Sequence, residues 1–172
     1  SEPISLYGAT KRSNELIAYT YSHLYNLHTT GLRFFTVYGP WYRPDMAMSI
    51  FSGRILSGKP ISVYNNGNMK RDFTYIDDII NGTLAAMEKN YNCEIFNLGN
   101  RKSENIMDMI SLIEKELNTK AIIDFQPMQP GDAYETCADI DYSKEKIDYN
   151  PSISIEEGIP LFIKWYKEYY NV

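Results

Sequence analysis

Residues 32 to 38 read Leu-Arg-Phe-Phe-Thr-Val-Tyr, an almost continuous apolar run that Gly39-Pro40 closes. Such a run, without alternation between apolar and polar residues, is typical of a strand buried on both faces of a parallel sheet. Residues 7 to 26 precede it, carry apolar side chains at helical spacing, and contain no glycine or proline after Gly8. The sequence therefore predicts a long helix that leads into a buried parallel strand.

Helices and strands continue to alternate along the rest of the chain. We expect further helices over about 47–57, from Asp77 or Asp78 to about 89, after a Ser103 cap, and at the C-terminal end. We expect strands over 61–64, 71–76, 94–98 and 121–125, with a turn over 65–68 and a loop over 126–136. This order of elements predicts an α/β fold.

The start of the last helix is open on sequence grounds. Ser154 and Glu157 form a capping box, which favours a helix that begins directly after Ser154. Pro160 would then remove an interior hydrogen bond, so a helix that begins nearer Ile159, with Pro160 in its first turn, is equally consistent.

Composition excludes several classes of protein. The 172 residues are 44% hydrophobic, contain 17 basic and 22 acidic residues, and carry a net charge of -5. This excludes a disordered chain and argues against nucleic acid or an anionic membrane as a partner, because no global positive charge attracts polyanions. No apolar run approaches the roughly 18 to 20 residues of a bilayer span. Any phosphate must be bound by local charges.

Cysteine and histidine spacing argues against a metal site. Cys93 and Cys137 lie 44 residues apart, and His23 and His28 lie in one segment far from both. We interpret the cysteines as reduced thiols of a cytoplasmic protein. The chain starts at Ser1 without an initiator methionine or an export signal, as a piece cut from a longer protein would.

The first chemical motif is Tyr7-Gly8-Ala9-Thr10-Lys11, at the start of the first predicted helix. Its phenol and its ammonium are four residues apart and project from one helix face. A neighbouring positive charge favours phenolate over phenol, so Tyr7 is a candidate general base. An exposed helix end with an incidental tyrosine and lysine is the alternative, since the chain contains 15 tyrosines.

Six blocks in order carry a resemblance to a known family. They are Tyr7 to Lys11, Gly31 to Pro40, Arg43-Pro44-Asp45-Met46-Ala47, Arg71 to Asp78, Asn97-Leu98-Gly99-Asn100 and Met128-Gln129-Pro130-Gly131-Asp132. The chain resembles the NAD-dependent epimerase/dehydratases of the extended short-chain dehydrogenase family over nearly its whole length, and within them most resembles the UDP-glucuronate 4-epimerases. The resemblance implies the C-terminal part of a Rossmann-type doubly wound sheet plus a small α/β substrate-binding lobe.

Two features of that family are missing from the sequence. No glycine-rich dinucleotide fingerprint occurs anywhere in it, and no catalytic serine or threonine stands some two dozen residues before Tyr7. We therefore expect a C-terminal half that is inactive alone and does not bind NAD measurably. On the same resemblance, residues 1–40 end the dinucleotide-binding domain, and 41–172 form mainly the substrate lobe, with about 77–110 returning to the first domain.

The resemblance also implies roles for individual residues. Tyr7 would take the proton from the sugar 4-hydroxyl, and Lys11 would hold the nicotinamide ribose of NAD. Tyr64 would lie near the uracil, Arg71 would pair with the diphosphate, and Asp132 would contact a ribose. Thr36 and Arg43 would bind the sugar carboxylate.

Without the resemblance, three of these residues have ordinary structural readings. Tyr64 would be a strand-edge aromatic, Arg71 a solvated charge beside Asp72, and Asp132 a turn residue after Gly131. Tyr42, where the UDP-glucuronate epimerases commonly have glycine, alters the surroundings of Arg43.

The implied function is NAD-dependent epimerisation at C4 of a UDP-sugar, UDP-glucuronate to UDP-galacturonate, through a 4-keto intermediate and without a metal. The implied partner is a second copy, bound through the helix that begins at Tyr7 in a homodimer. A decarboxylase or dehydratase on the same scaffold is an alternative enzyme. A non-catalytic nucleotide-sugar binding or assembly module is an alternative of another class.

Overall fold

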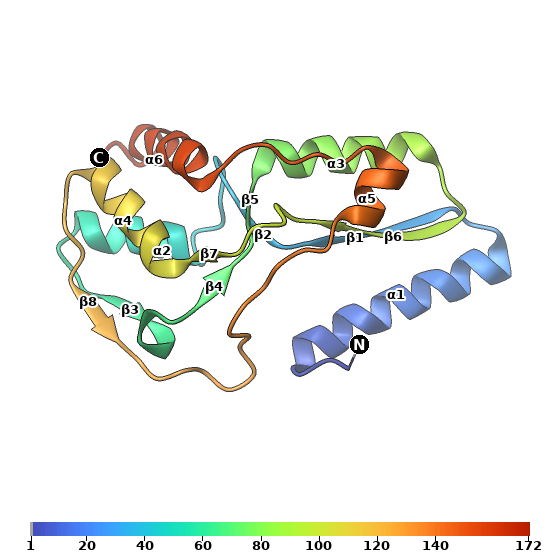
Figure 1. The fold of residues 1–172 in the computed structure, drawn as a ribbon, viewed down its shortest axis with the longest axis horizontal. Coiled ribbons are helices and arrows are strands. Elements are labelled where there is room, and N and C mark those ends of the chain that lie inside the picture. Colours follow the sequence, from blue (N-terminus) through green and yellow to red (C-terminus); the bar gives the residue numbers. More distant parts are fainter. Residues whose placement is uncertain (1) are drawn as a thin grey trace.

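The computed structural model describes residues 2–172 and has an α/β architecture (Figure 1). Its helices are α1 Leu6–Tyr25, α2 Ala47–Leu56, α3 Ile76–Lys89, α4 Ile106–Leu117, α5 Asp141–Ile147 and α6 Ile155–Tyr170, with a short 3-10 helix at Tyr64–Gly67. Its strands are β1 Thr29–Phe34, β2 Thr36–Tyr38, β3 Ile61–Val63, β4 Lys70–Arg71, β5 Phe73–Tyr75, β6 Cys93–Leu98, β7 Glu104–Asn105 and β8 Ile123–Phe125. The order confirms the predicted alternation.

The apolar run at 32–38 is two strands rather than one. β1 pairs with β6 in parallel, whereas β2 pairs in parallel with β5. Phe35 lies at the break, where its N–H donates to Leu98 O and the N–H of Thr36 donates to Asp72 O. The chain changes partner strand here, so the residues after Phe35 leave the β1–β6 sheet and enter the other half of the molecule.

Each half of the molecule has its own core. One cluster combines α2, α4 and α6 with β2, β3 and β5, and includes Met48, Ile110 and Phe162. The other combines α3, α5 and β6, with Phe96 and Tyr149 among its members. Apolar burial of this kind is the main stabilising contribution to folding, and the two clusters meet at the β1–β2 break.

Buried Asp72 ties the two halves together. Its Oδ1 accepts hydrogen bonds from Asn100 N at 2.6 Å and Thr74 Oγ1 at 3.0 Å, and its Oδ2 accepts from Ala138 N at 2.9 Å. A buried carboxylate is tolerated when such donors satisfy it. The side chain fixes the backbone immediately after Arg71.

Helix α1 lies along one side of the sheet and is exposed over most of its surface. Ser5 caps its start by accepting a hydrogen bond from Gly8 N at 3.1 Å. Glu15 joins it to β1 through Arg33, with contacts of 2.6 and 2.8 Å, and also pairs with Arg12. The bond from Arg33 lowers the pKa of Glu15 to about 2, further helped by Arg12 and opposed by burial.

Two predicted helix caps were wrong. Tyr75 is the cap of α3, and Asp77 and Asp78 lie in its first turn. Asn105, rather than Ser103, caps α4, because its side chain accepts from Met107 N at 2.8 Å. Glu104–Asn105 pairs with Lys70–Arg71 as β7, and this extended pairing delays the start of the helix.

The C-terminal region also differs from the sequence reading. Helix α5 at Asp141–Ile147 was not predicted; it is short and packs on β6. Helix α6 begins at Ile155 behind the capping box, and Pro160 lies inside it, which settles the open boundary. Gly158 permits this helix to approach β2, since a Cβ there would lie 2.2 Å from Tyr38 Oη. Within residues 2–172, none of the helices has the length and apolar character needed to traverse a bilayer.

Candidate functional site

A groove of about 530 Å³ runs between α1 and β1 and contains the tyrosine–lysine pair. Tyr7 and Lys11 line it on the helix side, and Leu32, Arg33 and Phe34 line it on the strand side. The Lys11 Nζ lies 5.4 Å from the centre of the Tyr7 ring, so the predicted one-face arrangement is confirmed. Tyr7 is 72% exposed, which leaves its hydroxyl accessible to a ligand.

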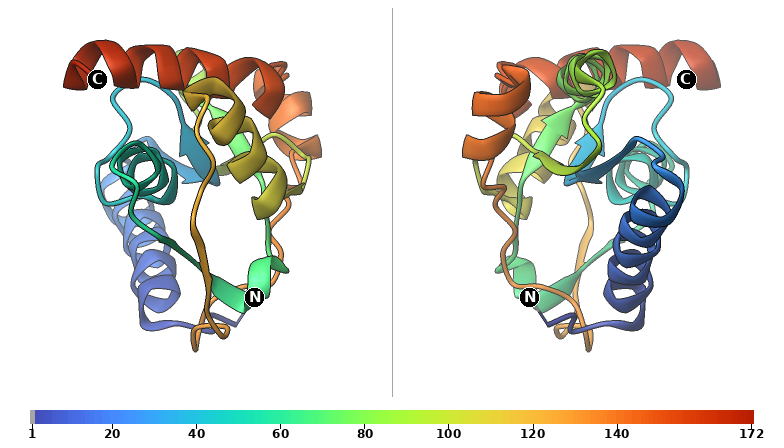
Figure 2. Two further views of the ribbon diagram at one scale, coloured as in Figure 1. Left: turned by 90° about the vertical axis from the view of Figure 1, so that its left-hand side faces the viewer. Right: turned by 90° about the vertical axis from the view of Figure 1, so that its right-hand side faces the viewer.

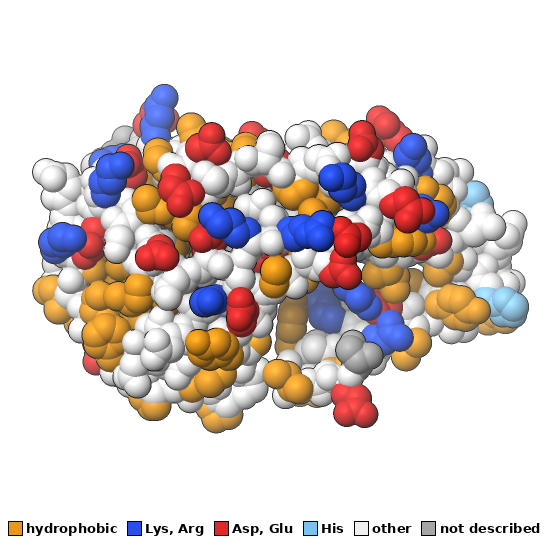
Figure 3. Space-filling model, viewed as in Figure 1, with side chains coloured by type: hydrophobic (Ala, Val, Ile, Leu, Met, Phe, Trp, Pro, Cys, Tyr) orange, Lys and Arg blue, Asp and Glu red, His pale blue; other side chains and the backbone are white. Residues whose placement is uncertain are grey.

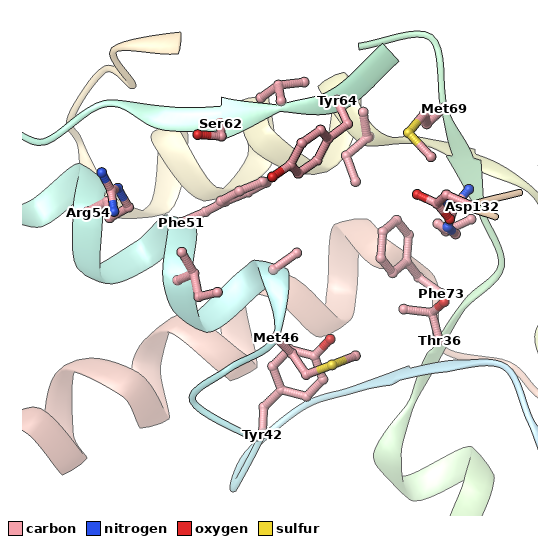
Figure 4. Close-up of a pocket in the computed structure, with 15 residues that line it drawn as sticks. Thr36, Tyr42, Met46, Phe51, Arg54, Ser62, Tyr64, Met69, Phe73 and Asp132 are labelled. Atoms are coloured by element: carbon pink, nitrogen blue, oxygen red, sulfur yellow. Dashed lines mark hydrogen bonds and ion pairs between the residues drawn. The ribbon is translucent and has the colours of Figure 1, made fainter. Parts of the chain in front are cut away.

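A second cavity, of about 480 Å³, lies in the other half of the molecule. It collects four of the residues singled out from the sequence: Thr36, Tyr64, Arg71 and Asp132. Figure 4 shows Thr36, Phe73 and Asp132 at one end of this cavity and Arg54 and Ser62 at the other. The fold therefore brings together residues that are as far as 96 positions apart in the sequence.

The groove and the cavity lie close to each other at the carboxyl end of β1. Phe34 lines the groove and Thr36 lines the cavity, and two residues of extended chain span only about 7 Å. On the opposite side, a Cβ at Gly131 would lie 3.9 Å from Ile4 O and from Ser5 Cβ, so the loop that carries Asp132 touches the start of α1. Parallel α/β sheets bind ligands at this end of their strands.

Arg71 and Asp132 form an ion pair at the cavity wall. Arg71 Nη2 donates to Asp132 Oδ1 at 2.8 Å, while Nη1 donates to Lys70 O at 2.8 Å and to Tyr134 O at 3.4 Å. The arginine side chain is only 16% exposed. These bonds leave two of the guanidinium's five N–H groups without a partner among residues 2–172.

Tyr64 reaches the cavity from a tight turn. It begins the 3-10 segment, in which Asn65 and Asn66 have φ values of 49° and 51° and Gly67 has a φ of 80°. Asparagine and glycine tolerate this left-handed region, as the composition of 65–68 predicted. In Figure 4 the Tyr64 ring projects toward Phe51, so two aromatic rings face the same space.

Arg43 is not among the residues that line this cavity. Its Nη2 and Nε contact the Asp45 carboxylate at 2.5 and 3.1 Å, and its side chain is 73% exposed. The hydrogen bond that Arg43 donates to Asp45 raises the pKa of Arg43 above its ordinary value, with smaller contributions from Tyr42 and Tyr7. In the chain Arg43 lies between Tyr42 and Met46, both of which line the cavity, so its backbone passes beside the cavity while its side chain faces solvent.

Sequence reasoning missed several cavity residues. Phe51 and Arg54 lie three positions apart on α2 and share one face of it, and neither was expected to be a binding residue. Ser62, on β3, and Tyr42 were likewise not assigned to a binding site. Burial raises the pKa of Tyr42 to about 12, so it contributes a neutral hydroxyl. Only the three-residue spacing of Phe51 and Arg54, which places them on one helix face, could have indicated from the sequence that they share a cavity.

The charges around these hollows are mixed. Acidic and basic side chains are interspersed over the face in Figure 3. Among residues 2–172, histidine, cysteine and carboxylate side chains form no group of three that could hold a metal ion. An anionic ligand would have to be bound by the arginines at the cavity.

Comparison with known proteins gives a consistent result. A family model described as the NAD dependent epimerase/dehydratase family matches residues 1–99. The chain is 54% identical to an uncharacterized protein of Methanocaldococcus jannaschii, over 97% of this chain and 51% of that protein. It is 43% identical to UDP-glucuronate 4-epimerase 4 of Arabidopsis thaliana, over 99% of this chain and 43% of that enzyme. The chain spans about half the length of the curated relatives it matches.

A solved structure agrees with the fold. The UDP-glucuronic acid 4-epimerase from Bacillus cereus, crystallised with UDP-glucuronic acid and NAD, superposes with a TM-score of 0.92 at 37% identity. The superposition covers 98% of this chain and 55% of that one.

Proposed function

The chain belongs to the NAD dependent epimerase/dehydratase family, and from that premise we propose that it supplies the substrate-binding part of an enzyme that inverts C4 of UDP-glucuronate. The observation that carries this proposal is the gathering of Thr36, Tyr64, Arg71 and Asp132 around one cavity that adjoins the Tyr7–Lys11 groove. Its volume of about 480 Å³ lies within the usual range for small-molecule sites.

The proposed binding mode follows the polarity of the cavity. The uracil lies by the aromatic rings of Tyr64 and Phe51. The diphosphate takes the two free N–H groups of Arg71, whose planar fork suits phosphate oxygens. Asp132 accepts from a ribose hydroxyl while it continues to orient Arg71. Thr36 and Arg43 then meet the sugar and its carboxylate at the end of the cavity nearest Tyr7.

NAD is the proposed cofactor, and the groove beside α1 offers a fitting donor for it. Lys11 forms no ion pair with any of residues 2–172, so its ammonium is available for ribose hydroxyls. Held there by Lys11, NAD would supply the reversible hydride acceptor that inversion at C4 requires. The glycine-rich motif that would hold its pyrophosphate does not occur in this sequence.

The chain's own chemical role is proton transfer and positioning. Tyr7 takes the proton of the sugar 4-hydroxyl and later returns it, so one phenol serves both directions. The Lys11 ammonium lies 5.4 Å from the centre of the Tyr7 ring, so both groups are available at the same side of the helix. Between the two transfers, the 4-keto sugar turns over in the pocket while Arg71 retains the diphosphate. The configuration at C4 is thereby inverted without net redox change.

We assign residues 1–40 to the end of the dinucleotide-binding domain and 41–172 mainly to the substrate lobe, with about 77–110 returning to the first domain. The pairing of β1 with β6, whose residues are 59 or more positions apart, supports that return. We also propose a homodimer through α1, which has no buried residue and exposes Leu16, Ile17 and Leu24. The free thiols Cys93 and Cys137 support a cytoplasmic location.

The decisive experiment has two parts. Calorimetry with the 172-residue chain measures the affinity for UDP-glucuronate, with UDP alone and UMP as probes of the diphosphate subsite. Product chromatography with the full-length protein and NAD then tests conversion of UDP-glucuronate to UDP-galacturonate. Binding that is no tighter to UDP than to UMP, together with no epimer formation, would contradict the proposal.

A further inference from the structure

The loop between β2 and α2 contains a tryptophan in a backbone conformation that large residues avoid. Trp41 has a φ of 64°, and its side chain is 76% exposed. For a bulky residue a positive φ is an outlier that surrounding contacts must maintain. Strained backbone positions cluster at functional sites.

Aromatic contacts to α6 hold Trp41 in place. Its ring centre lies 5.3 Å from that of Tyr169, in a T-shaped arrangement with planes 72° apart, and 5.8 Å from that of Trp165. Trp165 and Tyr169 are themselves stacked at 5.3 Å. These separations are in the attractive range for aromatic pairs. Figure 2 shows this loop passing beneath α6 in both views.

Side chains, rather than backbone, fix this loop. The backbone of residues 41–46 makes two hydrogen bonds within the part of the chain that the structure describes. Met46 N donates to Arg43 O at 3.2 Å, and Met46 O accepts from Ile50 N of α2 at 3.0 Å. Tyr42 packs its ring edge against Phe162 of α6 at 6.0 Å and lines the cavity. Arg43 comes next and faces solvent. The place of Arg43 therefore depends on the two aromatic residues that precede it.

We propose that Trp41 is a positioning residue for Arg43. Through its contacts with Trp165 and Tyr169, Trp41 keeps the guanidinium of Arg43 at the edge of the cavity. The site then favours a substrate that carries a carboxylate. The inference rests on the proposed function, because it assumes that Arg43 meets the sugar carboxylate. Trp41 touches no substrate on this account and acts only through the path of the loop.

The test compares dissociation constants for UDP-glucuronate and neutral UDP-glucose in the full-length protein. Trp41→Gly keeps the positive φ accessible without strain but removes the ring. We expect it to weaken UDP-glucuronate binding about tenfold and UDP-glucose binding less than twofold. Trp41→Tyr keeps an aromatic ring and should therefore retain most of the wild-type preference for UDP-glucuronate over UDP-glucose. Tyr169→Ala removes the partner of Trp41 on α6 and should cause part of the same loss of UDP-glucuronate affinity.

Two controls separate positioning from general destabilisation. Leu161→Ala removes another exposed apolar side chain of α6 and should leave both constants unchanged. In a background that carries Arg43→Ala, adding Trp41→Gly should cause no further loss of UDP-glucuronate affinity, because the residue through which it acts is gone. Equal losses for both sugars, or additive losses in the double variant, would overturn the inference.

The outcomes also distinguish this inference from the proposed function. If wild-type protein binds both sugars equally and Arg43→Ala changes neither constant, the carboxylate role of Arg43 fails, and the inference fails with it. If Arg43→Ala removes the preference but Trp41→Gly leaves it intact, only the inference fails. If Trp41→Gly does not fold, the comparison uses Tyr169→Ala as the variant that loses the aromatic contact and Trp41→Tyr as the variant that keeps an aromatic ring.

Discussion

Arg71 Nη2 donates a hydrogen bond to Asp132 Oδ1 across 2.8 Å, although 61 residues separate the two in the chain. The bond joins β4 to the loop that touches the start of α1. It orients the guanidinium of Arg71, which lines the cavity and retains two N–H groups without a partner among residues 2–172. On the proposed function Arg71 binds the diphosphate, and its orientation then depends on Asp132 as well.

Replacing Arg71 tests the diphosphate subsite. We expect Arg71→Ala to weaken UDP binding by the 172-residue chain about 10- to 100-fold, since hydrogen bonds to charged groups contribute roughly 1.5 to 3 kcal/mol. Arg71→Lys should recover little, because an ammonium lacks the planar fork. Asp132→Asn should cause a smaller loss. Calorimetry with UDP measures all three.

The matched control is Arg101→Ala, which removes an exposed arginine that pairs with Asp141 outside the cavity. It should leave UDP affinity unchanged. If Arg71→Ala binds UDP as wild type does, Arg71 is a structural residue only.

Replacing Tyr7 tests the proton-transfer role. Tyr7→Phe removes one hydroxyl and keeps an exposed ring, so the melting temperature should not change. In the full-length protein turnover should fall by about 10²- to 10⁴-fold, the usual contribution of a general base, while UDP-glucuronate still binds. Tyr25→Phe, on the same helix, is the control. A near-normal rate for Tyr7→Phe would mean that another residue moves the proton.

Replacing Arg43 tests the choice of sugar. A 4-keto uronic acid has its ketone β to the carboxylate and loses CO₂ when that carboxylate is free to rotate, so the enzyme must hold it. Arg43→Ala in the full-length protein should weaken UDP-glucuronate binding roughly tenfold or more and release some CO₂ per turnover, with little effect on UDP-glucose. Product chromatography and CO₂ measurement decide this. Equal effects on both sugars would make Arg43 a phosphate or structural residue.

The bond between Glu15 and Arg33 gives a pH-dependent contribution to stability. Folding lowers the pKa of Glu15 from an ordinary value of 4.5 to about 2, mainly through Arg33. The ionised form is therefore favoured in the folded state, and its stabilisation is complete above about pH 4.5, declines between 4.5 and 2, and is lost below that. Glu15→Gln should lower the free energy of unfolding by roughly 1 kcal/mol at pH 7. The loss is small because Arg12 and Arg33 are half exposed, and solvent screens their charges.

Urea unfolding at pH 7 and pH 3 measures this difference. The difference in free energy of unfolding between wild type and Glu15→Gln should be smaller at pH 3 than at pH 7. Glu145→Gln, which removes an exposed pair with Lys146, should leave stability unchanged at both. If the difference in free energy of unfolding is the same at both pH values, Glu15 stabilises the fold by packing rather than by its charge.

The local features of this protein could be predicted from its residues. Apolar periodicity located α1, α2 and α6, the Asn-Asn-Gly turn was given by residues that tolerate positive φ, and the four-residue spacing of Tyr7 and Lys11 placed them on one helix face. Each of these depends on neighbours within a few positions. The ordered motifs also carried the family, because they are properties of the residue string alone.

The grouping of distant residues around one cavity depends on the packing of the whole chain. The exchange of strand partners at Phe35 follows from hydrogen bonds to Leu98 and Asp72, and no local propensity encodes it. The same packing turned Asp132 toward Arg71 and brought Arg54 to the cavity wall. It also kept Trp41 in a left-handed conformation against α6. Such arrangements arise from contacts between segments dozens of residues apart, whose free energies depend on the whole fold, so a one-dimensional pattern does not contain them.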